Sequence, residues 1–180
     1  MKKAFTLLEL VMVILVIGIL AAAIIPRTRT NPLAEASISL LAQIRYTQHL
    51  SLVNDKYDVN NSSSWFKNRW YIEFINNSYS IVSNTTYAIN PLDKISKIQN
   101  IKLKGIESII LSNGCANQTI INFDYLGRPL IGDLSGTSKP YTAIGTAGQL
   151  LTTKCTIKLT NGSKEAYIDI SPETGYLIIR

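Results

Sequence analysis

The chain has 180 residues, of which 46% are hydrophobic and 17% charged, with a formal net charge of +6. This length suits one ordinary globular domain beside an N-terminal segment, and the absence of a repeat at a fixed period excludes a solenoid. The basic excess is modest and forms no long run, so composition permits binding to nucleic acid or an anionic surface without indicating it.

The first 25 residues form an apolar run with a basic start. Lys2 and Lys3 precede the run, and Glu9 lies inside it. Residues 5–25 would make roughly 30 Å of helix, which is enough to span a bilayer. We therefore expect a transmembrane helix over 5–25 with a cytoplasmic N-terminus. A carboxylate in such a segment needs a partner, so Glu9 is a candidate functional residue.

These residues resemble the N-terminal signal of type IV prepilins and of type II secretion pseudopilins. The match covers Lys2-Lys3-Ala4, Phe5-Thr6-Leu7-Leu8-Glu9-Leu10-Val11 and Ile25-Pro26-Arg27. It implies that residues 1–4 are a leader, which a prepilin peptidase removes between Ala4 and Phe5, and that Phe5 is N-methylated. Glu9 would then serve filament assembly by pairing with an α-amine. Ala4 stands where this family usually has glycine.

Two simpler interpretations of the segment stay open. Ala21-Ala22-Ala23 fits the cleavage site of an ordinary secretory signal, although Glu9 is unusual inside such a signal. The other is a plain membrane anchor without processing.

The resemblance also implies a location and a set of partners. It places the protein in the bacterial inner membrane as a single-pass protein with a periplasmic C-terminal domain, before the subunit enters a periplasmic pseudopilus or pilus. The implied partners are other pilin or pseudopilin subunits, the prepilin peptidase, the inner-membrane assembly platform and inner-membrane lipid. It implies no cofactor and no metal.

Residues 26–53 predict an amphipathic helix. Asn31-Pro32 is typical of an N-cap followed by proline at the first helical position. Apolar residues then recur at helical spacing to about Val53. We expect this helix to resume after a kink and to continue the N-terminal helix into the globular domain.

Residues 54–180 predict a β-rich domain, because the apolar period changes to two. Two hairpins are expected, one around Asn76-Asn77-Ser78 and one around Asn161-Gly162. Further strands are expected at 106–111, 119–123 and 176–179, and loops or weak strands at 54–69, 84–105 and 132–150. The predicted fold class is α+β. The resemblance makes it pilin-like, with a long N-terminal helix, half anchor and half amphipathic, packed on one or two antiparallel sheets.

Cys115 and Cys155 are an even pair in a segment expected to be exported. An oxidising compartment favours a disulfide between them. Closing a loop of about forty residues would stabilise the fold by about 3–4 kcal/mol in the loop-entropy model. A metal site with two thiolate ligands is the alternative, and it would need further ligands.

Two C-terminal stretches resemble the GspH/FimT class of pseudopilins. They are Ile121-Asn122-Phe123-Asp124-Tyr125-Leu126-Gly127-Arg128-Pro129 and Ile168-Asp169-Ile170-Ser171-Pro172-Glu173-Thr174-Gly175-Tyr176. Gly127 and Gly175 fit turn positions that need a positive φ. Asp124 fits a residue that caps its own turn, with Arg128 as a partner.

The resemblance implies a minor pilin or pseudopilin that is assembled into a type II secretion pseudopilus or a related filament for protein secretion. The alternative is a minor type IV pilin of a competence pilus that takes up DNA. Basic side chains near the C-terminus are the candidates for DNA binding, and a solvated sheet face is the simpler interpretation of them: Arg128, Lys154, Lys158, Lys164 and Arg180.

An enzyme is not expected. Nucleophilic catalysis needs a nucleophile, a base and an orienting group. The sole histidine, His49, falls on the predicted helix of residues 26–53, where a surface or packing role is the simpler interpretation. The sequence contains no Walker loop and no HExxH motif.

Overall fold

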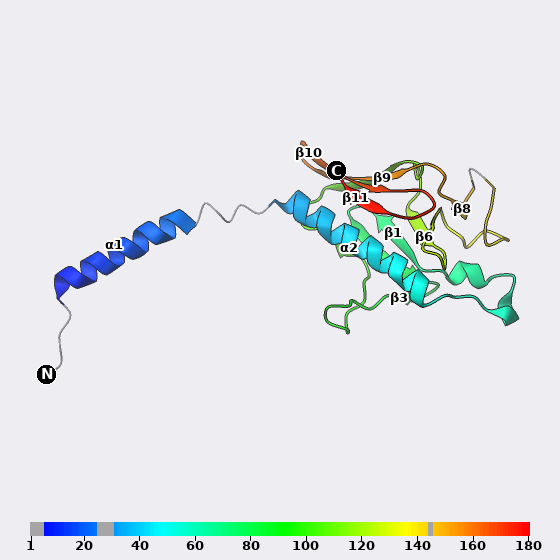
Figure 1. Ribbon diagram of the computed structural model, residues 1–180, viewed down its shortest axis with the longest axis horizontal. Helices are drawn as coiled ribbons and strands as arrows, with labels where there is room; N and C mark the ends of the chain where they lie inside the picture. Colours follow the sequence, from blue (N-terminus) through cyan, green and yellow to red (C-terminus); the bar gives the residue numbers. More distant parts are fainter. Residues whose placement is uncertain (1–5, 25–30, 144–145) are drawn as a thin grey trace. The chain divides into compact units, whose positions relative to one another are not determined.

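The computed structural model describes residues 6–24, 31–143 and 146–180. The chain divides into two compact units, residues 1–31 and 32–180, and each is described by itself. The first contains the helix α1, Leu7–Ile24, and the second begins with the helix α2, Pro32–Val53 (Figure 1).

The prediction of one long N-terminal helix packed on a sheet is wrong. The helical residues form two separate helices, and eleven strands make most of the regular structure among the described residues after α2. Pro32 is the first residue of α2. Because proline has no backbone N–H to donate, it begins a helix well and does not continue one from the preceding residues.

The predicted membrane anchor is wrong as well. Within residues 6–24, 31–143 and 146–180, no helix combines the length and the apolar character that a membrane crossing requires. This finding contradicts the predicted single-pass placement in the bacterial inner membrane; residues 5 and 25, the ends of the expected transmembrane helix, lie outside the described residues.

α2 runs over the residues that the sequence predicted for the second helix, from Pro32 to Val53. One face of it is buried, with Leu40 and Ile44 fully covered. The opposite face is open, and Ile38 on that side is 61% exposed. The helical spacing of the apolar residues therefore marks a real interface with the strands.

Strands and two short 3-10 helices follow α2. The 3-10 helices are η2 (Val59–Asn61) and η3 (Trp65–Asn68). The strands are β1 (Tyr71–Ile75), β2 (Ser78–Ser83), β3 (Thr86–Tyr87), β4 (Ile101–Lys102), β5 (Ser108–Asn113), β6 (Ile120–Phe123), β7 (Pro129–Ile131), β8 (Gln149–Leu150), β9 (Cys155–Asn161), β10 (Lys164–Ile170) and β11 (Leu177–Ile179).

Within the described residues the strands form two antiparallel sheets. The seven-stranded sheet has the order β3-β2-β1-β6-β7-β8, with β4 paired to β2, and the four-stranded sheet has the order β11-β10-β9-β5. β1 and β2 form the hairpin predicted around Asn76, whose φ is +55°. β9 and β10 form the one predicted around Asn161-Gly162, where Gly162 has a φ of +59°.

Both sheets contribute to one hydrophobic core with the buried face of α2. α2 contacts β9, β10 and β11 of the four-stranded sheet and β1 and β6 of the seven-stranded sheet. The fully buried side chains include Ile72, Ile121 and Phe123 from one sheet and Ile157 and Ile168 from the other.

Cys115 and Cys155 form a disulfide, and both are almost completely buried. Cys155 is the first residue of β9, where it lies opposite Asn113, the last residue of β5. The bond therefore ties the turn after β5 to the start of β9. Because both sulfur atoms are in this bond, neither is a thiolate for the alternative metal site.

Truncating a core side chain of α2 should destabilise the protein strongly. Ile44→Ala removes three buried carbon atoms from the contact with the sheets, so we expect a loss of about 2–5 kcal/mol in the free energy of unfolding. Ile38→Ala, on the exposed face of the same helix, is the matched control, with an expected change within about 0.5 kcal/mol. Urea unfolding followed by tryptophan fluorescence measures both. Equal losses for the two variants would contradict this placement of α2.

Candidate functional site

The start of α1 holds the residue that the sequence selected for assembly, Glu9. Its Oε2 atom accepts hydrogen bonds from the backbone N–H of Thr6 at 3.0 Å and from the Thr6 hydroxyl at 2.9 Å. The Thr6 Oγ1 atom in turn accepts from the Glu9 N–H at 3.3 Å. This reciprocal arrangement is a capping box, and it satisfies N–H groups that a helix start otherwise leaves unpaired. Thr-x-x-Glu is its sequence signature, and Thr6-Leu7-Leu8-Glu9 matches it.

The remaining surface of α1 is apolar on every side. The large apolar side chains from Leu7 to Leu20 are all at least 45% exposed. Glu9 is the sole charged residue in the sequence from Thr6 to Ile24. A helix that is hydrophobic on every side is normally buried by other apolar surfaces. α1 is therefore suited to burial among other apolar segments. Ala4 and Phe5, the predicted cleavage and methylation sites, lie outside the described residues.

The two C-terminal motifs come together beside α2. Gly127 and Gly175 have φ values of +76° and +64°, as the sequence predicted for their turns. Gln48 of α2 donates from Nε2 to the carbonyl oxygen of Gly127 at 2.8 Å and to that of Thr174 at 3.3 Å. A Cβ atom on Gly175 would lie 2.7 Å from the Gly127 carbonyl oxygen. The second glycine is therefore needed for the close approach of the turns as well as for its φ.

Arg128 is engaged with Asp124 in the first of these turns. Its Nε atom donates to Asp124 Oδ2 at 2.8 Å, and the carboxylate is completely buried. The other oxygen, Oδ1, accepts from the backbone N–H groups of Leu126 and Arg128 at 3.0 and 2.8 Å. Asp124 thus caps its own turn, and the Arg128 guanidinium balances the buried charge.

A second buried carboxylate, that of Asp169 in β10, forms ion pairs with two more of the candidate DNA-binding residues. Lys154 Nζ donates to its Oδ2 atom at 2.9 Å, and Arg180 Nε donates to the same atom at 3.1 Å. Thr156 donates to Oδ1 at 2.8 Å. Burial acts to raise the pKa of Asp169, but these three hydrogen bonds outweigh it and hold the pKa below its ordinary value.

The last two basic candidates lie on the β9–β10 hairpin. Lys158 pairs with Glu165 across the hairpin. Lys164 is exposed, and no ion pair within the described part of the chain includes it. Of the five basic residues proposed for DNA, the structure thus assigns four to carboxylates of the same fold.

Arg69, a buried cation that directly follows the 3-10 helix η3, was not among the site residues expected from the sequence. Its side chain lies between the rings of Trp65 and Tyr141, at 4.9 and 4.7 Å from their centroids. Nη1 donates to the carbonyl oxygen of Pro140 at 2.6 Å. Burial lowers the pKa of this arginine, while Tyr141 and Asp124 oppose the shift. No sequence signal identifies it, since Tyr141, one of its two aromatic partners, lies far away in the sequence.

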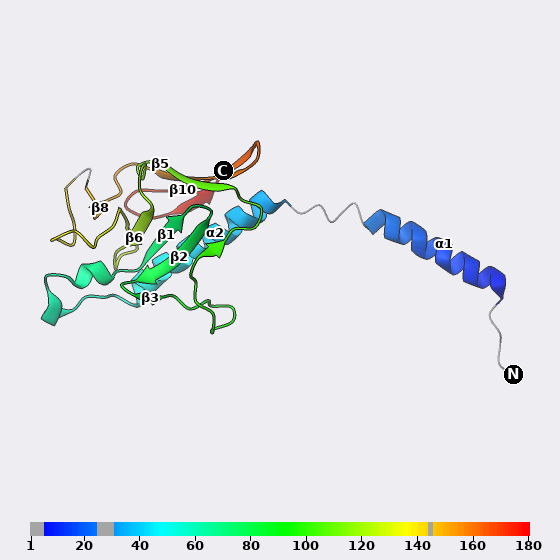
Figure 2. The ribbon, with the colours of Figure 1, turned by 180° about the vertical axis from the view of Figure 1, so that it is seen from behind.

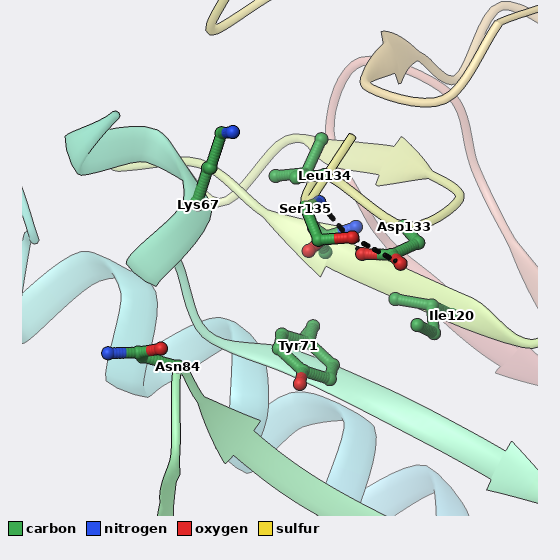
Figure 3. Close-up of a pocket in the computed structure, with 8 residues that line it drawn as sticks. Lys67, Tyr71, Asn84, Ile120, Asp133, Leu134 and Ser135 are labelled. Atoms are coloured by element: carbon green, nitrogen blue, oxygen red, sulfur yellow. Dashed lines mark hydrogen bonds between the residues drawn. The ribbon is translucent and has the colours of Figure 1, made fainter. Parts of the chain in front are cut away.

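A pocket of about 200 Å³ opens on the seven-stranded sheet (Figure 3). Asp133 at its edge accepts two hydrogen bonds from Ser135, one from the backbone N–H at 2.8 Å and one from the hydroxyl at 2.7 Å. Neither cysteine nor histidine is among the described residues that line it, which are Lys67, Tyr71, Asn84, Ile120, Asn122, Asp133, Leu134 and Ser135. His49 lies elsewhere, exposed on α2. None of the predicted site residues falls in this pocket.

No protein-family model, no curated protein and no solved structure matches the chain. The resemblance to prepilins and pseudopilins therefore rests on the residues quoted above.

The ion pairs of Asp169 should make stability depend on acid. The folded pKa is lower than the unfolded one, so the unfolded chain takes up the proton more readily. The stabilisation is therefore complete above the unfolded pKa of about 3.9 and is lost as the pH falls through the folded value. We expect Asp169→Asn to cost about 1–3 kcal/mol at pH 7 and to reduce the loss of stability between neutral pH and pH 3.

Urea unfolding at a series of pH values measures this dependence. Glu107→Gln, at an exposed position, is the control and should leave the acid dependence as in the unaltered protein. An Asp169→Asn variant with the same acid dependence as the unaltered protein would contradict the assignment.

Proposed function

We propose that the protein is a minor pilin or pseudopilin, which a prepilin peptidase processes and which is assembled into a type II secretion pseudopilus or a related filament. The observation that carries the proposal is α1, a helix with apolar side chains on every side and one carboxylate at its capped start. Within a filament, α1 helices of neighbouring subunits would cover one another.

The location of Glu9 supports a role in contacts between subunits. Cleavage after Ala4 would create an α-amine at Phe5, next to Thr6, whose N–H group donates to the Glu9 carboxylate. Between packed apolar helices, where the effective dielectric constant is low, opposite charges attract far more strongly than in water. We infer that the Glu9 carboxylate pairs with this amine, on the same subunit or on a neighbour, and that the capping box orients it.

The globular unit has a hydrophobic core of its own. This core contains side chains from α2 and from both sheets and is tied by a disulfide, and it includes no described residue of α1. The partners in this proposal are the other subunits, the peptidase and the assembly platform of the filament. DNA binding is not proposed, because four of the five basic candidates are paired with carboxylates of the fold: Asp124, Glu165 and Asp169.

The proposal predicts that the charge of Glu9 is needed for assembly. Glu9→Val removes the charge and the capping group, whereas Glu9→Gln removes the charge and keeps an acceptor for the capping box. We expect both variants to accumulate normally and to be absent from filaments, because an unpaired amine would remain among apolar helices. The measurement is the fraction of the protein that sediments with sheared filaments.

Ile14→Val, a conservative change on the same helix, is the matched control and should assemble normally. If Glu9→Gln assembled normally while Glu9→Val did not, Glu9 would act through the capping box alone. If both assembled normally, the proposed role of Glu9 would be wrong.

A further inference from the structure

The chain between β3 and β4 forms a loop that extends away from the sheets (Figures 1 and 2). Residues 90–96, at its outer end, are named the tip loop here. The base is fixed in the domain: Ala88 and Ile98 are buried, and the Ile98 N–H donates to the Ala88 carbonyl oxygen at 2.8 Å. Tyr46 of α2 also donates to the carbonyl oxygen of Ile89 at 2.9 Å.

The tip loop itself is closed by several hydrogen bonds. The Asn90 N–H donates to the Ser96 carbonyl oxygen at 2.8 Å, and the Lys94 N–H donates to the Asn90 carbonyl oxygen at 2.9 Å. Asp93 Oδ1 accepts from the N–H groups of Ile95 and Ser96 at 2.9 and 3.0 Å. Pro91 adds a residue with a fixed φ. The loop therefore holds its shape before any partner arrives.

This ordered loop presents two aliphatic side chains to solvent. Leu92 is 90% exposed and Ile95 is 83% exposed, more than any other large apolar side chain in the described part of the globular unit. Single exposed apolar residues are ordinary on protein surfaces. Two such side chains at the outer end of a hydrogen-bonded loop indicate a contact with something outside the domain.

The charges around the tip loop are mainly positive. Lys94 and Lys97 lie on either side of Ile95, whereas Lys102 and Lys104 lie within and just after β4, beyond the loop. All four lysines are exposed, and none takes part in an ion pair within the described residues. The one acidic residue from 88 to 106, Asp93, uses its carboxylate to close the loop. The surface therefore suits an anionic partner.

We propose that the tip loop binds an anionic lipid surface, with Leu92 and Ile95 entering the interfacial layer and the lysines lying over the phosphates. Apolar insertion and attraction to anionic headgroups reinforce one another at such a surface. DNA is the other polyanion that the lysines of the loop would suit. It is disfavoured because aliphatic tips gain nothing from a phosphate backbone, whereas single-stranded binding sites use aromatic platforms.

The test uses the full chain and a local probe, since the apolar surface of α1 is itself expected to adhere to lipid. Leu92→Cys is labelled with the environment-sensitive fluorophore NBD; the two native cysteines are in the buried disulfide and do not compete. We expect a blue shift and brightening with phosphatidylglycerol vesicles and little change with phosphatidylcholine vesicles or duplex DNA. Leu126→Cys labelled in the same way, at another exposed leucine, should report no insertion.

Charge variants sharpen the test. In the labelled protein, Lys94→Gln and Lys97→Gln should each weaken the response to phosphatidylglycerol about fivefold. Lys164→Gln, at an exposed lysine on the β9–β10 hairpin, should leave it unchanged. The proposal is overturned if the probe at 92 is silent, if the probe at 126 responds equally, or if DNA gives the larger response. A response that rises with protein concentration in the absence of lipid would also overturn it.

Discussion

The buried face of α2 is shared by both sheets, and the globular unit depends on that contact. Leu40 and Ile44 have no exposed surface, and the helix contacts strands of the four-stranded and the seven-stranded sheet alike. Gln48, one turn beyond Ile44, holds the two glycine turns that follow β6 and β10. The disulfide adds a covalent tie between β5 and β9. Loss of the α2 contact would open both sheets to water at once.

Local features of this fold were predictable because local chemistry dictates them. Asn31-Pro32 sets the start of α2, and the residues at Asn76 and Gly162 permit the tight turns of the two hairpins. The long helix was mispredicted because the resemblance, rather than the residues, supplied its continuity. β8 lies in a segment that was expected only as loop or weak strand, because it is two residues long and carries no alternating pattern. Strands of this kind are defined by the neighbour they pair with, which a single sequence does not reveal.

The ion pairs of Asp169 were likewise not predictable, because their partners are distant in the sequence. Lys154 and Arg180 lie 26 positions apart in the sequence, and they meet because β9, β10 and β11 align them around Asp169. Sequence counting therefore overestimated the basic character of the C-terminal region. Two lysines without an ion pair in the described residues, Lys94 and Lys97, belong to or adjoin the tip loop, in a segment that the sequence marked only as loop or weak strand. The paired basic residues near the C-terminus therefore stabilise the fold, whereas the lysines at the tip loop carry the charge for the proposed lipid contact.

The central claim is that α1 is an assembly element released by cleavage before Phe5. The most direct test is the intact mass and N-terminal sequence of the protein isolated from its native cell. The account predicts a chain that begins at N-methylated Phe5 and retains the Cys115–Cys155 disulfide. A chain that begins at Met1, or one cut near Ile24 so that α1 is lost, would contradict it.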